Sequence, residues 1–310
     1  MAAVTAAMVK ELREMTGAGM MDCKKALNAT DGDMDKAVEF LREKGLAAAA
    51  KKAGRIADEG LVMIVTKGDQ EAAIVEVNSE TDFVAKNADF QAYVKEVAEQ
   101  ALASDAADMD AFMAEAWAKD PSKTVAQELS SKIAIIGENL NIRRFERVGA
   151  ENGCVVGYTH GGGRIGVLVV AETAVVNDEV KEALKNVAMQ IAALRPQYVC
   201  REEMSEEFIE KEKEILLAAA RNEKPDAPEK VLLGMVNGRL SKELKEFCLV
   251  DQVYVKAEDG KQTVGKYLDE VSKAAGAKVS VKRFVRFETG EGLEKKNEDF
   301  AAEVAKQMAH

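Results

Sequence analysis

Two stretches that lie far apart in this chain have nearly the same sequence pattern. Residues 141–148 read Asn-Ile-Arg-Arg-Phe-Glu-Arg-Val, and residues 280–287 read Ser-Val-Lys-Arg-Phe-Val-Arg-Phe. Each stretch comes after two strand-like runs and a helix-like run in the same order. We interpret this recurrence as an internal duplication of an α+β unit. The alternative is that alternating arginine and apolar residues suit any half-exposed strand, without a duplication.

The duplicated core is expected to have two halves, residues 56–148 and 149–288. Short polar links such as residues 67–70 join the strand-like runs into hairpins, so the strands should be antiparallel. In the order hairpin, helix and return strand, the first half has its elements at 61–66, 72–78, 90–102 and 140–148. The second half has them at 155–159, 165–171, 180–194 and 280–287. This order of elements predicts the α+β class.

The two halves differ in what comes before the return strand. Residues 104–131 are polar and rich in Ala, and they predict helix interrupted at Pro121. Residues 203–246 have a heptad-like pattern that is broken by Pro225 and Pro228. We therefore expect two antiparallel helices that project as an inserted coiled-coil hairpin. The apolar positions expected between these helices are Phe208, Ile209, Ile215, Leu216, Val231, Leu232, Met235, Val236 and Leu240.

Smaller helical parts are expected at both ends. Residues 1–55 predict three short helices, in which Thr5 and Asp33 cap the first and third helices. Gly45 is expected just past the third helix, followed by a helical connector. The inward-facing residues should be Met8, Val9, Leu12, Met15, Cys23, Ala26, Leu27, Met34, Ala37, Val38 and Leu41. Residues 289–310 predict a C-terminal module with an amphipathic helix.

The composition argues against several classes of protein. Lys and Arg total 43 against 54 Asp and Glu, and a chain with a formal charge of −11 is repelled by nucleic acid phosphates. No apolar run is long enough to span a membrane, and no secretory signal is visible. The four cysteines lack the spacing of a zinc or redox site, so we expect free thiols and a cytoplasmic location. These cysteines are Cys23, Cys154, Cys200 and Cys248.

No group of residues has the pattern of a catalytic, metal or cofactor site. Residues 161–166, Gly-Gly-Gly-Arg-Ile-Gly, fit the spacing of a dinucleotide-binding motif. Such a motif must lead into a helix, whereas these glycines lead into a strand-like run, so we expect a hairpin turn. His160 has no nucleophile or orienting acid near it in the sequence and fits an exposed contact residue. We expect a protein that is not an enzyme and has no cofactor.

Residues 81–84, Thr-Asp-Phe-Val, are the strongest candidate for a functional motif. They follow a strand-like run, at a place where loops often carry function. Phe83 could act as a wedge that enters a crevice of another protein, while the Asp82 carboxylate acts on polar groups there. The alternative is that Phe83 covers this protein's own core and Asp82 caps a short helix.

A series of motifs along the chain resembles the bacterial elongation factor Ts family. The longest motif, at residues 16–27, reads Thr-Gly-Ala-Gly-Met-Met-Asp-Cys-Lys-Lys-Ala-Leu. The other matching segments are 10–13, 81–84, 136–139, 142–144, 160–161, 164–169, 286–288 and 290–292. They follow one another over nearly the whole chain, whereas residues 104–131 and the helical hairpin match only in character.

The resemblance implies a nucleotide-exchange factor for the GTPase elongation factor Tu, with no direct nucleic acid or membrane partner. It implies that the three-helix head has a ubiquitin-associated-like fold and docks on the GTPase domain. Asp82 and Phe83, supported by Thr81 and Val84, would intrude near the magnesium and phosphate site of the GDP-bound partner. Further partner contacts are implied at Leu12, Met20, Met21, Lys24, Ile136, Gly137 and His160. A scaffold or chaperone-like adaptor without exchange activity is the alternative.

Overall fold

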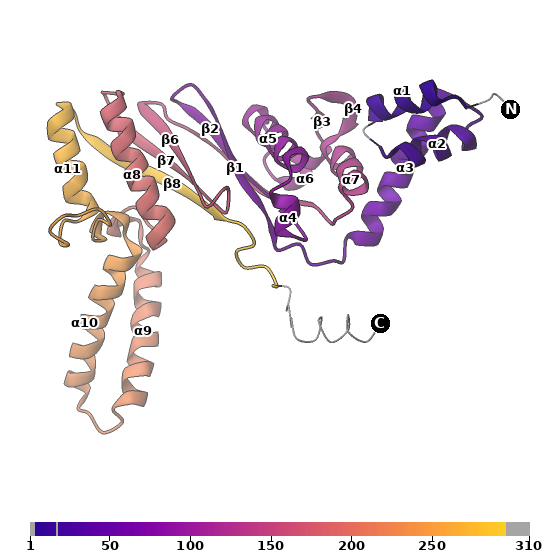
Figure 1. Cartoon of the computed structure of the whole chain (residues 1–310). Helices are drawn as coiled ribbons and strands as arrows, with labels where there is room; N and C mark the ends of the chain where they lie inside the picture. Colours follow the sequence, from indigo (N-terminus) through magenta and orange to yellow (C-terminus); the bar gives the residue numbers. More distant parts are fainter. Residues whose placement is uncertain (1–3, 17, 296–310) are drawn as a thin grey trace. The chain divides into compact units, whose positions relative to one another are not determined.

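A computed structural model describes residues 4–16 and 18–295 of the chain. These residues form two compact units. Of these residues, the first unit contains 4–16, 18–63, 73–146 and 287–295, and the second contains 64–72 and 147–286. Both helices and small sheets are present, so the α+β class is confirmed (Figure 1). In the described ranges, no helix has the length and apolar character that a membrane span requires.

The first unit begins with the three predicted helices, α1 (Ala6–Thr16), α2 (Met20–Ala29) and α3 (Met34–Lys52). Both predicted caps are confirmed. The Thr5 hydroxyl accepts the Met8 N–H at 3.3 Å, and the Asp33 carboxylate accepts the Lys36 N–H at 3.1 Å. The fully buried side chains of this head are Leu12, Cys23, Ala26, Leu27 and Ala37.

Two details of the head differ from the prediction. Gly45 does not follow the third helix, because α3 continues through it and includes the predicted connector. At Gly45 the helix packs closely on α7 (Val125–Ile136), where the Ser130 carbonyl oxygen lies 3.6 Å from the position of an added Cβ. This packing offsets the low helix propensity of glycine. Met15 is exposed and takes no part in the core of the head.

The first sheet has the order β1-β2-β5, formed by β1 (Glu59–Lys67), β2 (Glu71–Ser79) and β5 (Asn141–Gly149). The central strand β2 is buried along nearly its whole length, as expected for a strand covered on both faces. A one-turn helix, α4 (Asp82–Ala85), follows β2 and leads into α5 (Ala88–Ala103). The candidate motif therefore lies at the exit of the central strand.

The segment 104–131 is not the interrupted helix that its composition predicts. It contains α6 (Met109–Ala114), a small two-stranded sheet of β3 (Ala116–Trp117) and β4 (Asp120–Thr124), and the start of α7. The Asp120 carboxylate accepts the N–H and the hydroxyl of Ser122, a local pattern that competes with helix around Pro121. The Trp117 side chain is buried, with its ring centroid 6.1 Å from that of Tyr93.

The second unit contains a sheet of the same order, β6-β7-β8, formed by β6 (Gly153–His160), β7 (Ile165–Thr173) and β8 (Val279–Glu288). Strands β6 and β7 are antiparallel, and α8 (Asp178–Leu194) packs against both. Helix α11 (Val264–Ala275), which the sequence did not predict, contributes Val264 and Leu268 to this core.

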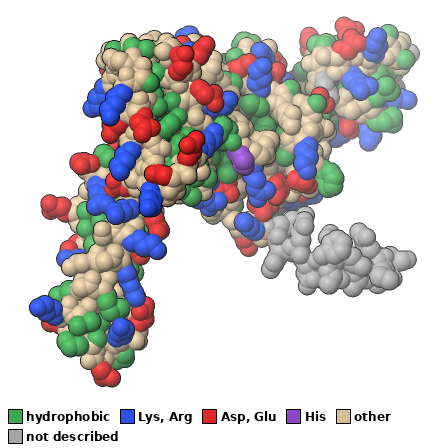
Figure 2. Space-filling model, turned by 60° about the vertical axis from the view of Figure 1, so that its left-hand side comes forward, with side chains coloured by type: hydrophobic (Ala, Val, Ile, Leu, Met, Phe, Trp, Pro, Cys, Tyr) green, Lys and Arg blue, Asp and Glu red, His purple; other side chains and the backbone are tan. Residues whose placement is uncertain are grey.

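The second unit also carries the predicted helical hairpin, formed by α9 (Glu206–Glu223) and α10 (Glu229–Phe247). Its buried residues are Leu216, Ala220, Leu232, Val236 and Leu240. Ile215 and Val231 are exposed, contrary to the prediction. Each comes directly before a buried residue, and neighbouring residues on a helix point about 100° apart. Figure 2 shows hydrophobic side chains gathered near the free end of this hairpin.

The hairpins that begin the two sheets share a further feature. Gly60 in β1 has a φ of 129°, and Gly153 in β6 has a φ of 147°. A Cβ added at Gly60 would overlap the Val77 carbonyl, and one added at Gly153 would overlap the Ala171 carbonyl. The same glycine position and the same strand order support the proposed duplication. The domain boundaries predicted from the sequence stay a prediction. The predicted C-terminal helix over residues 298–308 lies outside the described residues.

Candidate functional site

The motif at residues 81–84 forms an exposed turn. Thr81 is the N-cap of α4, and its hydroxyl accepts the Val84 N–H at 3.4 Å. Phe83 is 81% exposed, so it does not cover this protein's own core. Thr81, and not Asp82, caps the short helix. The alternative interpretation of the motif is therefore wrong on both points, and a large aromatic side chain lies open to solvent.

Asp82 lies beside Phe83 in the first turn of α4. Its carboxylate accepts a hydrogen bond from the Lys86 ammonium at 2.6 Å. This bond to Lys86 lowers the pKa of the Asp82 carboxyl below its ordinary value. The carboxylate is half exposed and ionised at neutral pH. The turn therefore presents an aromatic ring next to a negative charge.

A network of hydrogen bonds holds the chain just before this turn. Glu138 Oε2 accepts the N–H groups of Glu80 and Thr81 at 3.0 Å and 3.1 Å. Glu138 Oε1 accepts the Thr81 hydroxyl at 2.6 Å. On the other side, the Ser79 hydroxyl donates to the Thr81 carbonyl at 3.0 Å. Glu138 belongs to a segment that resembles the family, but no local sequence signal reveals its role, because its partners are 57 and 58 residues away.

An acidic hollow of about 410 Å³ adjoins the turn. Its lining residues are Asp58, Glu59, Glu80, Thr81, Asp82, Phe83 and Lys295. Across residues 4–16 and 18–295, no three His, Cys, Asp or Glu side chains are placed to hold a metal ion. The geometry of the turn thus fits a contact surface.

The implied contact residues of the head are not equally accessible. Met20, Met21 and Lys24 lie on α2 with exposed side chains. Leu12 has no exposed surface, because it packs in the core of the head. Its role in this structure is to support the three helices, and the implied contact of Leu12 with a partner stays a prediction.

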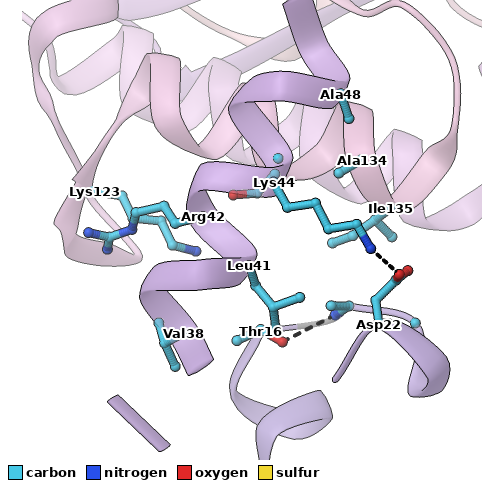
Figure 3. Close-up of a pocket in the computed structure, with 14 residues that line it drawn as sticks. Thr16, Asp22, Val38, Leu41, Arg42, Lys44, Ala48, Lys123, Ala134 and Ile135 are labelled. Atoms are coloured by element: carbon cyan, nitrogen blue, oxygen red, sulfur yellow. Dashed lines mark hydrogen bonds and ion pairs between the residues drawn. The ribbon is translucent and has the colours of Figure 1, made fainter. Parts of the chain in front are cut away.

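The head also packs on α7 around a pocket of about 130 Å³ (Figure 3). Figure 3 shows Asp22 of α2 paired with Lys44 of α3, and Ile135 of α7 on the wall of the same pocket. Met20 and Met21 are 58% and 63% exposed, and Ile135 is 45% exposed. The head and the end of α7 therefore both present apolar side chains to solvent.

Ile136 and Gly137 lie at the C-terminal end of α7. Ile136 is half-buried and is the last residue of the helix. Gly137 ends the helix in the left-handed region, with a φ of 89°, and its N–H donates to the Ile133 carbonyl at 3.0 Å. Gly137 thus has a structural role that a resemblance alone does not reveal. It turns the chain so that Glu138 reaches the segment before α4.

His160 lies in the second unit, at the last position of β6 before the hairpin turn. Its side chain is exposed, and the Tyr158 hydroxyl oxygen lies 2.8 Å from His160 Nδ1. The glycines that follow form the predicted turn together with Arg164, and β7 begins at Ile165. Gly161, Gly162 and Gly163 all have positive φ angles, which glycine adopts without strain. The nucleotide-motif interpretation is therefore not supported by the local structure.

Comparison with known proteins gives a consistent result. A family model described as "Elongation factor TS" matches residues 80–291. Elongation factor Ts of Clostridium novyi (strain NT) is 53% identical over 306 residues, which covers 98% of this chain and 99% of that protein. Elongation factor Ts of Clostridioides difficile (strain 630) is 52% identical over 309 residues, which covers 99% and 100%. The protein of the same name from Trichlorobacter lovleyi is 50% identical over 308 residues, which covers 98% of each chain.

These matches extend over both units and include the turn at Asp82 and Phe83. The shared name of these relatives describes an elongation factor. The chain belongs to the elongation factor Ts family.

Proposed function

We propose that this protein is a guanine-nucleotide exchange factor that binds GDP-bound elongation factor Tu and promotes the release of GDP. Membership of the elongation factor Ts family supports the role in translation elongation. The observation that carries the proposal is the exposed ring of Phe83 next to the ionised carboxylate of Asp82. A ring that is 81% exposed is available to a partner without any rearrangement of this chain.

The mechanism follows from how GTPases hold GDP. A magnesium ion and a phosphate-binding loop hold the diphosphate by concentrated charge. Phe83 would enter a crevice beside that site, and Asp82 would compete there for hydrogen-bond donors or disturb the surroundings of the metal. A buried aromatic anchor of this kind contributes about 2–4 kcal/mol at an interface. No covalent bond is made or broken, so the protein acts as a binding factor and not as an enzyme.

The effect on GDP must be reciprocal. If this protein weakens GDP binding to the GTPase by some factor, GDP weakens the binding of this protein by the same factor. The nucleotide-free GTPase is then the form to which the factor binds most tightly, and rebinding of nucleotide displaces the factor.

Several surfaces would share the binding energy. In the first unit, Met20, Met21 and Lys24 on the head and Ile136 at the end of α7 would add contacts. In the second unit, His160 on the hairpin would add another. Their exposed or half-exposed side chains support this arrangement. Thr81 and Val84 would support the turn that carries Asp82 and Phe83.

The proposal is tested by stopped-flow release of a fluorescent GDP analogue from elongation factor Tu, with and without this protein. We expect release to become faster as the factor concentration rises, up to a plateau. Binding to the GTPase without any change in the release rate would indicate the alternative, a scaffold or chaperone-like adaptor without exchange activity.

A further inference from the structure

Building on this exchange activity, we propose that Glu138 is a positioning residue that holds Thr81 and thereby presents Asp82 and Phe83 to the partner. Glu138 itself need not touch the partner. Both oxygens of its carboxylate are used inside the chain. They accept the N–H groups of Glu80 and Thr81 at 3.0 Å and 3.1 Å and the Thr81 hydroxyl at 2.6 Å.

The turn needs such an anchor because it has little stability of its own. Helix α4 has four residues, and a helix this short is not stable in isolation. None of its residues is fully buried, and Val84 and Ala85 are only half-buried, so hydrophobic packing gives the backbone of Asp82 and Phe83 little support. The cap from Thr81 to the Val84 N–H is long, at 3.4 Å. Hydrogen bonds to a charged acceptor are stronger than neutral ones, and those to Glu138 lie directly before the helix.

The segments around Glu80 and Glu138 are joined by hydrogen bonds in both directions. While the Glu138 carboxylate accepts the N–H of Glu80, the Glu80 carboxylate accepts the N–H of Asn139 at 2.6 Å. These bonds connect the exit of β2 to the residues that follow α7. Because Gly137 ends α7 with a φ of 89°, the chain turns there and places Glu138 against Thr81.

This connection joins two proposed partner contacts. Phe83 lies two residues after Thr81, and Ile136 lies two residues before Glu138. The bonds between Thr81 and Glu138 therefore set the distance between Phe83 and the end of α7. A residue with this role affects how fast a bound partner loses GDP more than how tightly the partner binds.

The test compares Glu138→Ala and Glu138→Gln with the wild-type chain and with the control Glu99→Ala. Glu99 is an exposed glutamate on α5 that is paired with Lys95 and Lys119 at 4.0 Å and 3.6 Å. Hydrogen exchange of the amides at residues 80–86 is measured in the free protein. The maximal rate of GDP release from elongation factor Tu and the half-saturating factor concentration are measured in parallel.

In Glu138→Ala we expect the amides of residues 80–86 to exchange about tenfold faster or more, while those of β2 stay protected. The maximal release rate should fall about tenfold, with a much smaller change in the half-saturating concentration. Glu138→Gln, which keeps one acceptor oxygen, should give exchange and release rates between those of Glu138→Ala and the wild type. Glu99→Ala should match the wild type in both. The loss in the double variant Thr81→Val/Glu138→Ala should be smaller than the sum of the two single losses, because both changes remove the bond between the Thr81 hydroxyl and Glu138. Thr81→Val also removes the cap to the Val84 N–H, so some further loss is expected.

The inference fails if the amides of residues 80–86 keep their protection in Glu138→Ala. It also fails if elongation factor Tu releases GDP at the wild-type rate in the presence of Glu138→Ala but not in the presence of Phe83→Ala. A wild-type protein that leaves GDP release unchanged would overturn the proposed function as well, so the two failures are distinguishable.

Discussion

The Glu76 carboxylate, which has no exposed surface, accepts a hydrogen bond from Arg144 Nε at 2.6 Å. Glu76 lies in the central strand β2 and Arg144 in the neighbouring strand β5. The same carboxylate accepts bonds from Arg143 at 3.1 Å and from the Gly290 N–H at 2.9 Å. A buried carboxylate thus ties the segment that follows β8 to the first sheet.

Replacing this carboxylate should strongly destabilise the first unit. Glu76→Ala leaves Arg143 and Arg144 without their buried acceptor, and breaking a buried pair costs about 3–5 kcal/mol. Urea unfolding followed by Trp117, the single tryptophan of the chain, reports on this unit. The control Glu99→Ala, in the same unit, removes exposed pairs with Lys95 and Lys119 and should cost about 1 kcal/mol or less. Equal costs for the two variants would contradict this account of Glu76.

A second stability test concerns Gly153. Its φ of 147° is strained for any other residue, and an added Cβ would overlap the Ala171 carbonyl. Gly153→Ala should therefore destabilise the second unit by about 2–4 kcal/mol, measured by native-state hydrogen exchange of β6 and β7. Gly162→Ala is the matched control. It also has a positive φ, of 67°, but open space around it, so about 1–2 kcal/mol is expected. If Gly153→Ala leaves the stability of the second unit unchanged, β6 can shift at its first residue.

The cysteines should differ sharply in reactivity. Burial raises the pKa of Cys248 to about 11, with a smaller contribution from the Asp251 charge. Burial also raises the pKa of Cys23 and Cys154. Burial raises the pKa of Cys200 as well, so the difference comes from solvent access. Iodoacetamide at about pH 8 should label only the half-buried Cys200 in the folded protein. Mass spectrometry of the digest checks this, and all four thiols should react after unfolding. Early labelling of Cys248 would contradict the packing of the second unit.

The role of Asp82 should be insensitive to pH over a wide range. Its lowered pKa keeps the carboxylate ionised above the ordinary aspartate value of about 4. The stabilisation from Lys86 is present above that value and is lost only as pH falls through the lowered pKa. The ratio of the GDP release rates promoted by wild type and by Asp82→Asn should thus stay constant between about pH 8 and pH 5. The ratio cancels the pH dependence of the GTPase itself, and a fall within this interval would contradict the prediction.

Local signals in the sequence predicted the parts of the fold that local interactions determine. The caps at Thr5 and Asp33, the hairpin turn after His160 and the helices α5 and α8 follow from propensity, side-chain bonds to the backbone and apolar periodicity. The helical hairpin was predicted, but the exposure of Ile215 was not. A continuous apolar pattern does not tell which of two adjacent residues faces the partner helix.

Long-range contacts explain what the sequence did not predict. The sheet of β3 and β4 depends on burial of Trp117 beside Tyr93, and α3 continues through Gly45 because α7 packs there. At the candidate site, the motif at Asp82 was visible in the sequence. The bonds from Glu138 were not, because they join residues that are far apart in the chain.

The most direct test of the central claim is the rate of GDP release from elongation factor Tu promoted by Phe83→Ala and by Asp82→Ala. The account predicts release at least about tenfold slower than with the wild-type protein, which corresponds to about 1.4 kcal/mol or more of lost stabilisation. Unfolding followed by Trp117 should be nearly unchanged, because Phe83 is 81% exposed and its truncation removes little packing in the described part of the chain. Release at the wild-type rate by a correctly folded Phe83→Ala protein would contradict the account.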